Sequence, residues 1–138
     1  VILATEPVDP FDIFRGQYLT IRYEIGTIPS IDGASVGDDV YVTLKEDMNG
    51  TSQYKEASLE KPPKDNIFIK GEIKSIYNDK MSVEYGIEQY FFERGGRFDS
   101  RSMEVKVKLS GSGSARIVEL LQDGKPVEIE YENKTLTS

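Results

Sequence analysis

The chain has 138 residues, a net charge of −7, 38% hydrophobic and 30% charged residues, and neither cysteine nor histidine. This composition is typical of a folded domain, and it excludes disulfides, cysteine and histidine catalysis and the usual zinc sites. The acidic charge also argues against nucleic acid as a partner, because phosphate binding requires a basic surface.

The first part of the chain predicts a strand, a short helical turn and a second strand. Residues 1–7 fit a lead-in strand or extended arm. Asp9 and Pro10 then suit the N-cap and first position of a helical turn, which Gly16 ends in a left-handed conformation. Residues 17–25 alternate with a period of two, which is typical of a half-buried strand. The side chains expected in the core are Leu19, Ile21, Tyr23 and Ile25, and the opposite face carries Tyr18 and Arg22.

The middle of the chain predicts two hairpins. Residues 27–38 are rich in glycine and small polar residues and are expected to form a loop. Residues 40–46 and 52–59 alternate around Asn49-Gly50, the strongest pair for a type I′ turn. Residues 67–77 and 81–85 follow as strands, with a tight turn at residues 78–80 and Gly71 as a candidate bulge or close approach.

The last part predicts one short helix near residues 87–94 and further strands. Ile87, Tyr90 and Phe91 match a helical spacing before Gly95-Gly96, a natural stop. Residues 103–109 alternate cleanly, and residues 115–121 fit helix or strand. We favour strand, because Asp123-Gly124 follows at hairpin spacing and residues 127–131 alternate after it. The expected fold is mainly β: a single antiparallel β-sandwich or small barrel of about eight strands with that one helix.

Two stretches carry a family resemblance. They are Gly16-Gln17-Tyr18-Leu19-Thr20-Ile21-Arg22-Tyr23 and Tyr85-Gly86-Ile87-Glu88-Gln89-Tyr90-Phe91. Together they resemble the GDYXXLXY family of bacterial proteins. Gly16, Tyr18 and Tyr23 match the motif, Gln17 replaces its Asp, and Ile21 replaces its Leu. A carboxylate at position 17 is therefore not essential chemistry in this chain.

The resemblance implies a location but no activity. It implies a cell-membrane protein in which a single N-terminal hydrophobic helix precedes an extracytoplasmic domain. No run in this sequence approaches the roughly 18–20 apolar residues that a membrane span needs. We therefore expect residues 1–138 to form one extracytoplasmic domain whose N-terminal membrane anchor is missing from this sequence.

The two stretches also supply the candidate binding or structural residues. For Gly16-Gln17-Tyr18 the interpretations are a corner glycine with a packed tyrosine, or a contact with a ligand or partner. Glu88 would either complement the first turn of the predicted helix or line a polar cleft near Tyr18 and Arg22. The full set is Arg15, Gly16, Gln17, Tyr18, Arg22, Tyr23, Tyr85, Gly86, Glu88 and Tyr90.

These residues predict no catalytic, cofactor or metal site. We expect a non-enzymatic domain that acts through contacts with membrane proteins of the same cell envelope. The alternative is a glycan- or peptide-binding domain of the envelope, with hydrolysis as an option. It would use a cleft lined by Tyr18, Arg22, Tyr41, Glu88 and Tyr90. A third option is a soluble cytoplasmic structural protein.

Overall fold

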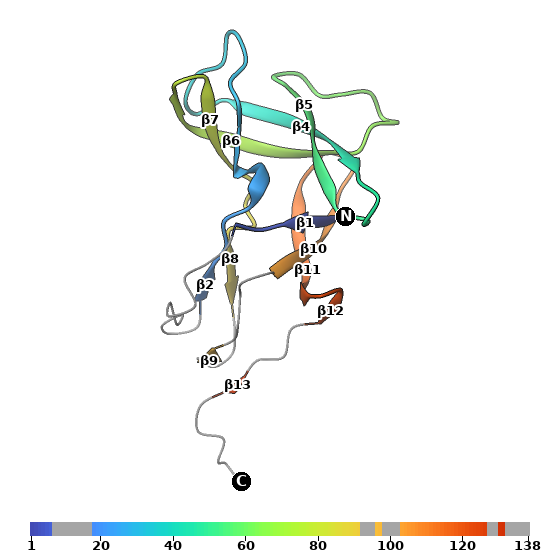
Figure 1. Cartoon of the computed structure of the whole chain (residues 1–138). Coiled ribbons are helices and arrows are strands. Elements are labelled where there is room, and N and C mark those ends of the chain that lie inside the picture. The colour runs from blue at the N-terminus through green and yellow to red at the C-terminus, as the bar shows by residue number, and fades with distance from the viewer. Residues whose placement is uncertain (7–17, 92–95, 98–102, 127–129, 132–138) are drawn as a thin grey trace.

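The computed structural model describes residues 1–6, 18–91, 96–97, 103–126 and 130–131. Within these residues strands dominate, and the one helical segment is a single 3-10 turn, η1 (Glu24–Gly26). The mainly β prediction is confirmed (Figure 1). The strands are β1 (Ile2–Ala4), β2 (Tyr18–Thr20), β3 (Thr27–Pro29), β4 (Asp39–Glu46), β5 (Ser52–Ser58), β6 (Phe68–Tyr77), β7 (Lys80–Glu84), β8 (Gln89–Phe91), β9 (Gly96–Arg97), β10 (Met103–Leu109), β11 (Ala115–Gln122), β12 (Lys125–Pro126) and β13 (Glu130–Tyr131).

Nine of these strands form one sheet in the order β12-β11-β10-β1-β5-β4-β6-β7-β3. The sheet is mixed rather than antiparallel throughout, because β1 runs parallel to β5 where Leu3 pairs with Ser52. It is not closed into a barrel, and neither the sandwich nor the barrel is confirmed. The pairs β2–β8 and β9–β13 are separate from this sheet, and β9–β13 lies below it in Figure 1.

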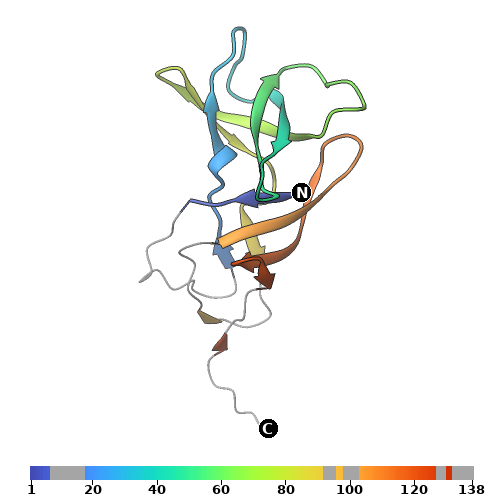
Figure 2. The same ribbon diagram turned by 45° about the vertical axis from the view of Figure 1, so that its right-hand side comes forward.

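The large sheet curls so that the β10–β11 hairpin reaches β6. The carbonyl of Gly113, in the hairpin loop, accepts a hydrogen bond of 2.9 Å from the Lys70 N–H. Gly113 has a φ of +92°, and a Cβ there would lie 2.8 Å from the Phe68 ring. This contact therefore joins strands that are not neighbours in the sheet. The hairpin runs beside the N-terminus in Figure 2.

The core follows the predicted alternation even where the strand is shorter than expected. Leu19, Ile21, Tyr23 and Ile25 are all at most 7% exposed, while Thr20, Arg22 and Glu24 face solvent. Only residues 18–20 are a strand, however. Tyr23 then forms an isolated bridge to Thr5, and the chain turns through η1. The helical turn expected around residues 9–16 lies outside the described residues.

Two tight turns have the backbone that their residues predict. Asn78 and Asp79 have φ values of 47° and 63° between the paired residues Tyr77 and Lys80. Asp123 and Gly124, with φ values of 51° and 77°, occupy the same positions between β11 and β12. Positive φ at both central residues is the mark of a type I′ hairpin turn.

The hairpin at Asn49-Gly50 forms, but the prediction that its turn is of type I′ is wrong. Gly50 has a φ of 85°, whereas Asn49 is not in the left-handed region. The Asp47 carboxylate accepts hydrogen bonds from the N–H groups of Asn49 and Thr51, at 2.8 and 3.0 Å. Asp47 therefore organises a longer loop, as short acidic side chains often do in turns.

Two other predictions are wrong for the described residues. The helix near residues 87–94 is replaced over 89–91 by β8, which pairs with β2, while residues 92–94 lie outside the described part. The pairing of β8 with β2 outweighs the helical spacing of Ile87, Tyr90 and Phe91. The loop expected at residues 27–38 begins with β3, which pairs with β7 at the edge of the sheet. Pro29 suits an edge because it has no N–H to donate.

Gly71 is a close approach, as one of its two interpretations predicted. A Cβ at this position would lie 2.5 Å from Val83 Cγ1, 2.8 Å from Tyr85 Cδ1 and 2.9 Å from the Glu84 carbonyl oxygen. The irregularity in the pairing of β6 with β7 comes later, between Ile73 and Ser75.

Replacement of Gly71 tests this packing. We expect Gly71→Ala to lower the free energy of unfolding by about 1–3 kcal/mol, because the new methyl group has no space. Gly111→Ala is the control, since a Cβ there meets nothing within 4 Å. It should change stability by less than about 0.5 kcal/mol. Urea unfolding measures both, and equal midpoints for the two variants would contradict the packing.

Candidate functional site

The two stretches singled out in the sequence lie side by side. In the β2–β8 pair, Leu19 is opposite Tyr90 and Thr20 is opposite Gln89. The Ile21 N–H extends this contact by donating a hydrogen bond of 2.7 Å to the Glu88 carbonyl. The first stretch is therefore joined by its backbone to the second, where the β2–β8 pair meets the large sheet.

Two buried tyrosines join the two segments here, each by a hydrogen bond to the segment that carries the other tyrosine. The Tyr23 hydroxyl donates a hydrogen bond of 2.6 Å to the Ile87 carbonyl, and the Tyr85 hydroxyl donates one of 2.7 Å to the Ile25 carbonyl. Each tyrosine thus binds the backbone two residues beyond the other tyrosine. The side chains of Tyr23 and Tyr85 are 2% and 5% exposed. We call Tyr23, Ile25, Tyr85 and Ile87 the tyrosine junction.

Glu88 stabilises the turn that carries Tyr85 into β8. Its carboxylate accepts hydrogen bonds from the N–H groups of Tyr85 and Gly86, at 2.8 and 2.9 Å. Gly86 has a φ of +84°, a conformation that glycine adopts without strain. The expected role at a helix N-terminus is wrong, because no helix begins here. The carboxylate instead satisfies the N–H groups of a turn.

The electrostatics of the junction keep both hydroxyls protonated. Burial raises the pKa of Tyr23 and of Tyr85 well above the usual value, and the nearby negative charge of Glu88 adds to the effect. A tyrosinate would lose hydration and would face a carboxylate. Both tyrosines therefore serve as hydrogen-bond donors.

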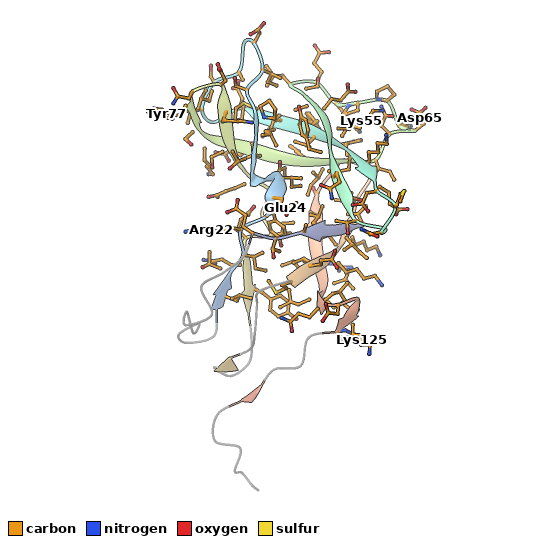
Figure 3. The ribbon with its side chains drawn as sticks, in the orientation of Figure 1. Arg22, Glu24, Lys55, Asp65, Tyr77 and Lys125 are labelled. Atoms are coloured by element: carbon orange, nitrogen blue, oxygen red, sulfur yellow. The ribbon has the colours of Figure 1, made fainter. Side chains whose placement is uncertain are left out.

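The remaining candidate residues surround the junction or lie outside the described part. Arg22 is exposed and points away from the ribbon in Figure 3. Tyr90 is half-buried and packs against the core. For Tyr18 the structure describes the backbone in β2. Arg15, Gly16 and Gln17 lie outside the described residues.

Two of the five side chains suggested for a cleft have other partners in the described part of the structure. Tyr41 lies in β4, where its ring packs edge-on against Phe68 with centroids 5.8 Å apart. Glu88 is engaged with the turn. Two surface hollows, of about 430 and 270 Å³, are lined by residues other than the five proposed for the cleft. In the described part of the chain, no group of three or more acidic residues is arranged to hold a metal ion.

The reciprocal bonds were not foreseen from the sequence, although one signal was available. Tyr23 falls on the buried side of an alternating stretch, and a buried tyrosine hydroxyl requires a partner. The sequence contains no information on which distant carbonyl that partner is. Ile25 and Ile87 contribute backbone oxygens, which any residue type would supply.

Comparison with known proteins places the chain in a family. The model of one family, described as GDYXXLXY protein, matches residues 1–120. The chain belongs to the GDYXXLXY family. No curated protein and no solved structure matches it. In this GDYXXLXY protein, the last two specified positions of the motif are Ile21 and Tyr23, and both are buried at the junction. Among the described residues, no helix has the length and apolar character to cross a bilayer.

Removal of either hydroxyl from this GDYXXLXY protein should loosen the junction. We expect Tyr23→Phe and Tyr85→Phe each to lower the free energy of unfolding by about 1–3 kcal/mol, because a buried carbonyl loses its donor. The control is Tyr77→Phe, since Tyr77 is 76% exposed. Urea unfolding of the three variants measures the difference. If neither variant loses more free energy of unfolding than Tyr77→Phe, the stabilising role of these two hydrogen bonds is contradicted.

Alkaline pH should unfold the GDYXXLXY domain through the same tyrosines. Their folded pKa values lie above the unfolded value of about 10. The contribution of the two tyrosines to the free energy of unfolding is therefore fully present below about pH 10. Above that pH the free energy of unfolding falls, by up to about 1.4 kcal/mol per pH unit for each tyrosine. Urea unfolding from pH 8 to 11 measures the slope. The Tyr23→Phe, Tyr85→Phe double variant should flatten it, and an unchanged slope would be inconsistent with this assignment.

Proposed function

We propose that this chain is the extracytoplasmic domain of a single-pass membrane protein that acts by contacts with other proteins of the cell envelope, without catalysis. The observation that carries the proposal is that the polar side chains at the junction are engaged in hydrogen bonds within the domain. The Tyr23 and Tyr85 hydroxyls and the Glu88 carboxylate all bind backbone groups of the same chain. Side chains held in this way support an architectural role for the motif.

Composition and family membership support the rest of the proposal. The chain lacks the two residue types, histidine and cysteine, that serve most often as general base and as soft nucleophile. Membership of the GDYXXLXY family supports a membrane tether before the domain, which the family resemblance implies.

The glycan- or peptide-binding alternative has less support from the geometry. It needs Tyr41 and Glu88 on one surface with free polar groups. Tyr41 instead packs on Phe68 in the large sheet, and the Glu88 carboxylate accepts two backbone hydrogen bonds. Arg22 and Tyr90 lie near the junction, and for Tyr18 the structure describes the backbone alone.

The Glu88→Gln variant separates the two functions. Under the proposal it lowers the free energy of unfolding by about 1–2 kcal/mol, because an amide nitrogen replaces one acceptor of a backbone N–H. Capture of cross-linked partners from membranes by the folded protein stays unchanged. Under the alternative, stability stays unchanged and binding to envelope glycans or peptides is lost. Glu24→Gln is the matched control, because Glu24 is exposed on the adjacent turn.

Fractionation of the full gene product tests the tether. We expect the protein to remain in the membrane fraction after alkaline extraction, and external protease to digest the domain in intact spheroplasts. Recovery in the soluble fraction would overturn the tether. Membrane recovery without any cross-linked protein, together with substrate turnover by the purified domain, would overturn the contact role.

A further inference from the structure

Three large apolar side chains are exposed at one end of the sheet. Val36, Ile76 and Tyr77 are 63%, 39% and 76% exposed. Val36 lies in the loop of residues 30–38, and the other two end β6 before its hairpin turn. This loop and this hairpin form the upper end of the molecule in Figure 1, and Figure 3 shows Tyr77 there. We call them the loop–hairpin tip. A gathering of apolar side chains on a surface is a feature of binding sites.

Backbone hydrogen bonds join the loop to the hairpin. The Gly37 N–H donates to the Ile73 carbonyl at 2.8 Å, and the Ile73 N–H donates to the Asp38 carbonyl at 2.9 Å. At the other end of the loop, the Ser30 N–H donates to the Asp79 carbonyl at 2.9 Å. The exposed side chains of the two segments therefore belong to one end of the domain with a fixed geometry.

Turn geometry places Val36 at the apex of the loop. The Asp38 N–H donates to the Ser35 carbonyl at 3.0 Å, and Gly37 has a φ of +94°. A glycine with this φ at the third position is typical of a type II turn, in which Val36 is the second residue. The turn itself requires no apolar side chain at that position, so it does not account for the exposed valine.

The hairpin end exposes apolar side chains on both faces of the sheet. Ile76 is opposite Met81, which is fully buried, so Ile76 lies on the core face. Tyr77 is opposite Lys80, which is exposed, so Tyr77 lies on the outer face. A rigid partner protein contacts one face of such a hairpin end, whereas lipid surrounds it. Stable protein interfaces also use roughly 20–30 residues a side, far more than the three here.

The residue types of the tip suit the boundary between lipid and water. In a chain with 30% charged residues, residues 30–37 contain one charged side chain, Asp32, and residues 75–78 contain none. Tyrosine concentrates at bilayer interfaces because its ring is apolar and its hydroxyl is polar. Lys80 forms no ion pair within the described ranges, and a lysine beside a ring extends its ammonium toward the headgroups.

The tip lies far from the N-terminal strand. The loop of the β10–β11 hairpin, whose strand β10 pairs with β1, meets β6 where the Lys70 N–H donates to the Gly113 carbonyl. Tyr77 lies seven residues further along β6, about 20 Å away at the rise of a twisted strand. A chain that continues β1 beside β10 would therefore leave the tip accessible.

We propose that the loop–hairpin tip inserts into the interface of a lipid bilayer, with Val36 and Ile76 below the headgroups and the Tyr77 hydroxyl among them. The inference rests on the proposed function, because a tether would keep a bilayer near the domain, and it adds which end of the domain contacts that bilayer. The net charge of −7 and the carboxylates of Asp32 and Asp79 oppose an anionic surface. The tip therefore suits zwitterionic lipid.

NMR with spin-labelled bicelles tests the proposal. The ¹⁵N-labelled chain is mixed with phosphatidylcholine bicelles, with and without a doxyl-labelled phosphatidylcholine. We expect the label to remove about half or more of the amide signal intensity at residues 35–37 and 75–80. The signal of Met48 should not change, because this side chain is fully exposed at another hairpin turn but stands alone. Addition of phosphatidylglycerol should weaken the effect by about twofold or more at low salt.

Variants of exposed residues provide the controls. The Val36→Ser, Tyr77→Ser variant should lose the effect of the label, whereas Met48→Ser should behave as the parent chain does. An unaffected tip, equal losses at the tip and at Met48, or the full effect in the double variant would each overturn the inference. If lipid has no effect and the double variant loses a cross-linked protein partner, the surface belongs to that protein. Failure with lipid while the full gene product stays in the membrane fraction would reject this inference and leave the tether standing.

Discussion

The exchange of hydrogen bonds between Tyr23 and Tyr85 is the constraint on which the arrangement of this protein depends. Each hydroxyl binds a carbonyl that follows the other tyrosine, so neither segment can shift without breaking both bonds. Both hydroxyls are shielded from water, where a hydrogen bond is strong and a missing partner is expensive. The junction therefore fixes how the β2–β8 pair leaves the large sheet.

This constraint gives a physical explanation for part of the family motif. The positions at Ile21 and Tyr23 bring an aliphatic side chain and a phenol into the core, while Thr20 and Arg22, on either side of Ile21, remain in solvent. Tyrosine is needed at the last position because only a long donor with an apolar ring can fill the core and reach a distant carbonyl. These two positions of the motif therefore build a corner of the fold.

Local patterns in the sequence correctly predicted the features that depend only on neighbouring residues. The alternation from Leu19 to Ile25 named the buried side chains, and Asn78-Asp79 named a turn, because each depends on neighbouring residues. The error at residues 89–91 has the opposite origin. Gln89 and Tyr90 form a strand because β2 lies beside them, about 70 residues away in the chain by the pairing of Leu19 with Tyr90. The parallel pairing of Leu3 with Ser52, the curl at Gly113 and the tyrosine junction are likewise invisible to a local pattern.

The position of the first strand has a consequence for how the protein is made. Val1 bonds to Val107, 106 residues later in the chain. At a synthesis rate of about 5–20 residues per second, the N-terminal strand would wait roughly 5–20 s for its neighbour to emerge. Contacts of such long range also slow folding. Strand β1 therefore stays without its β10 neighbour until residues 103–109 have been synthesised.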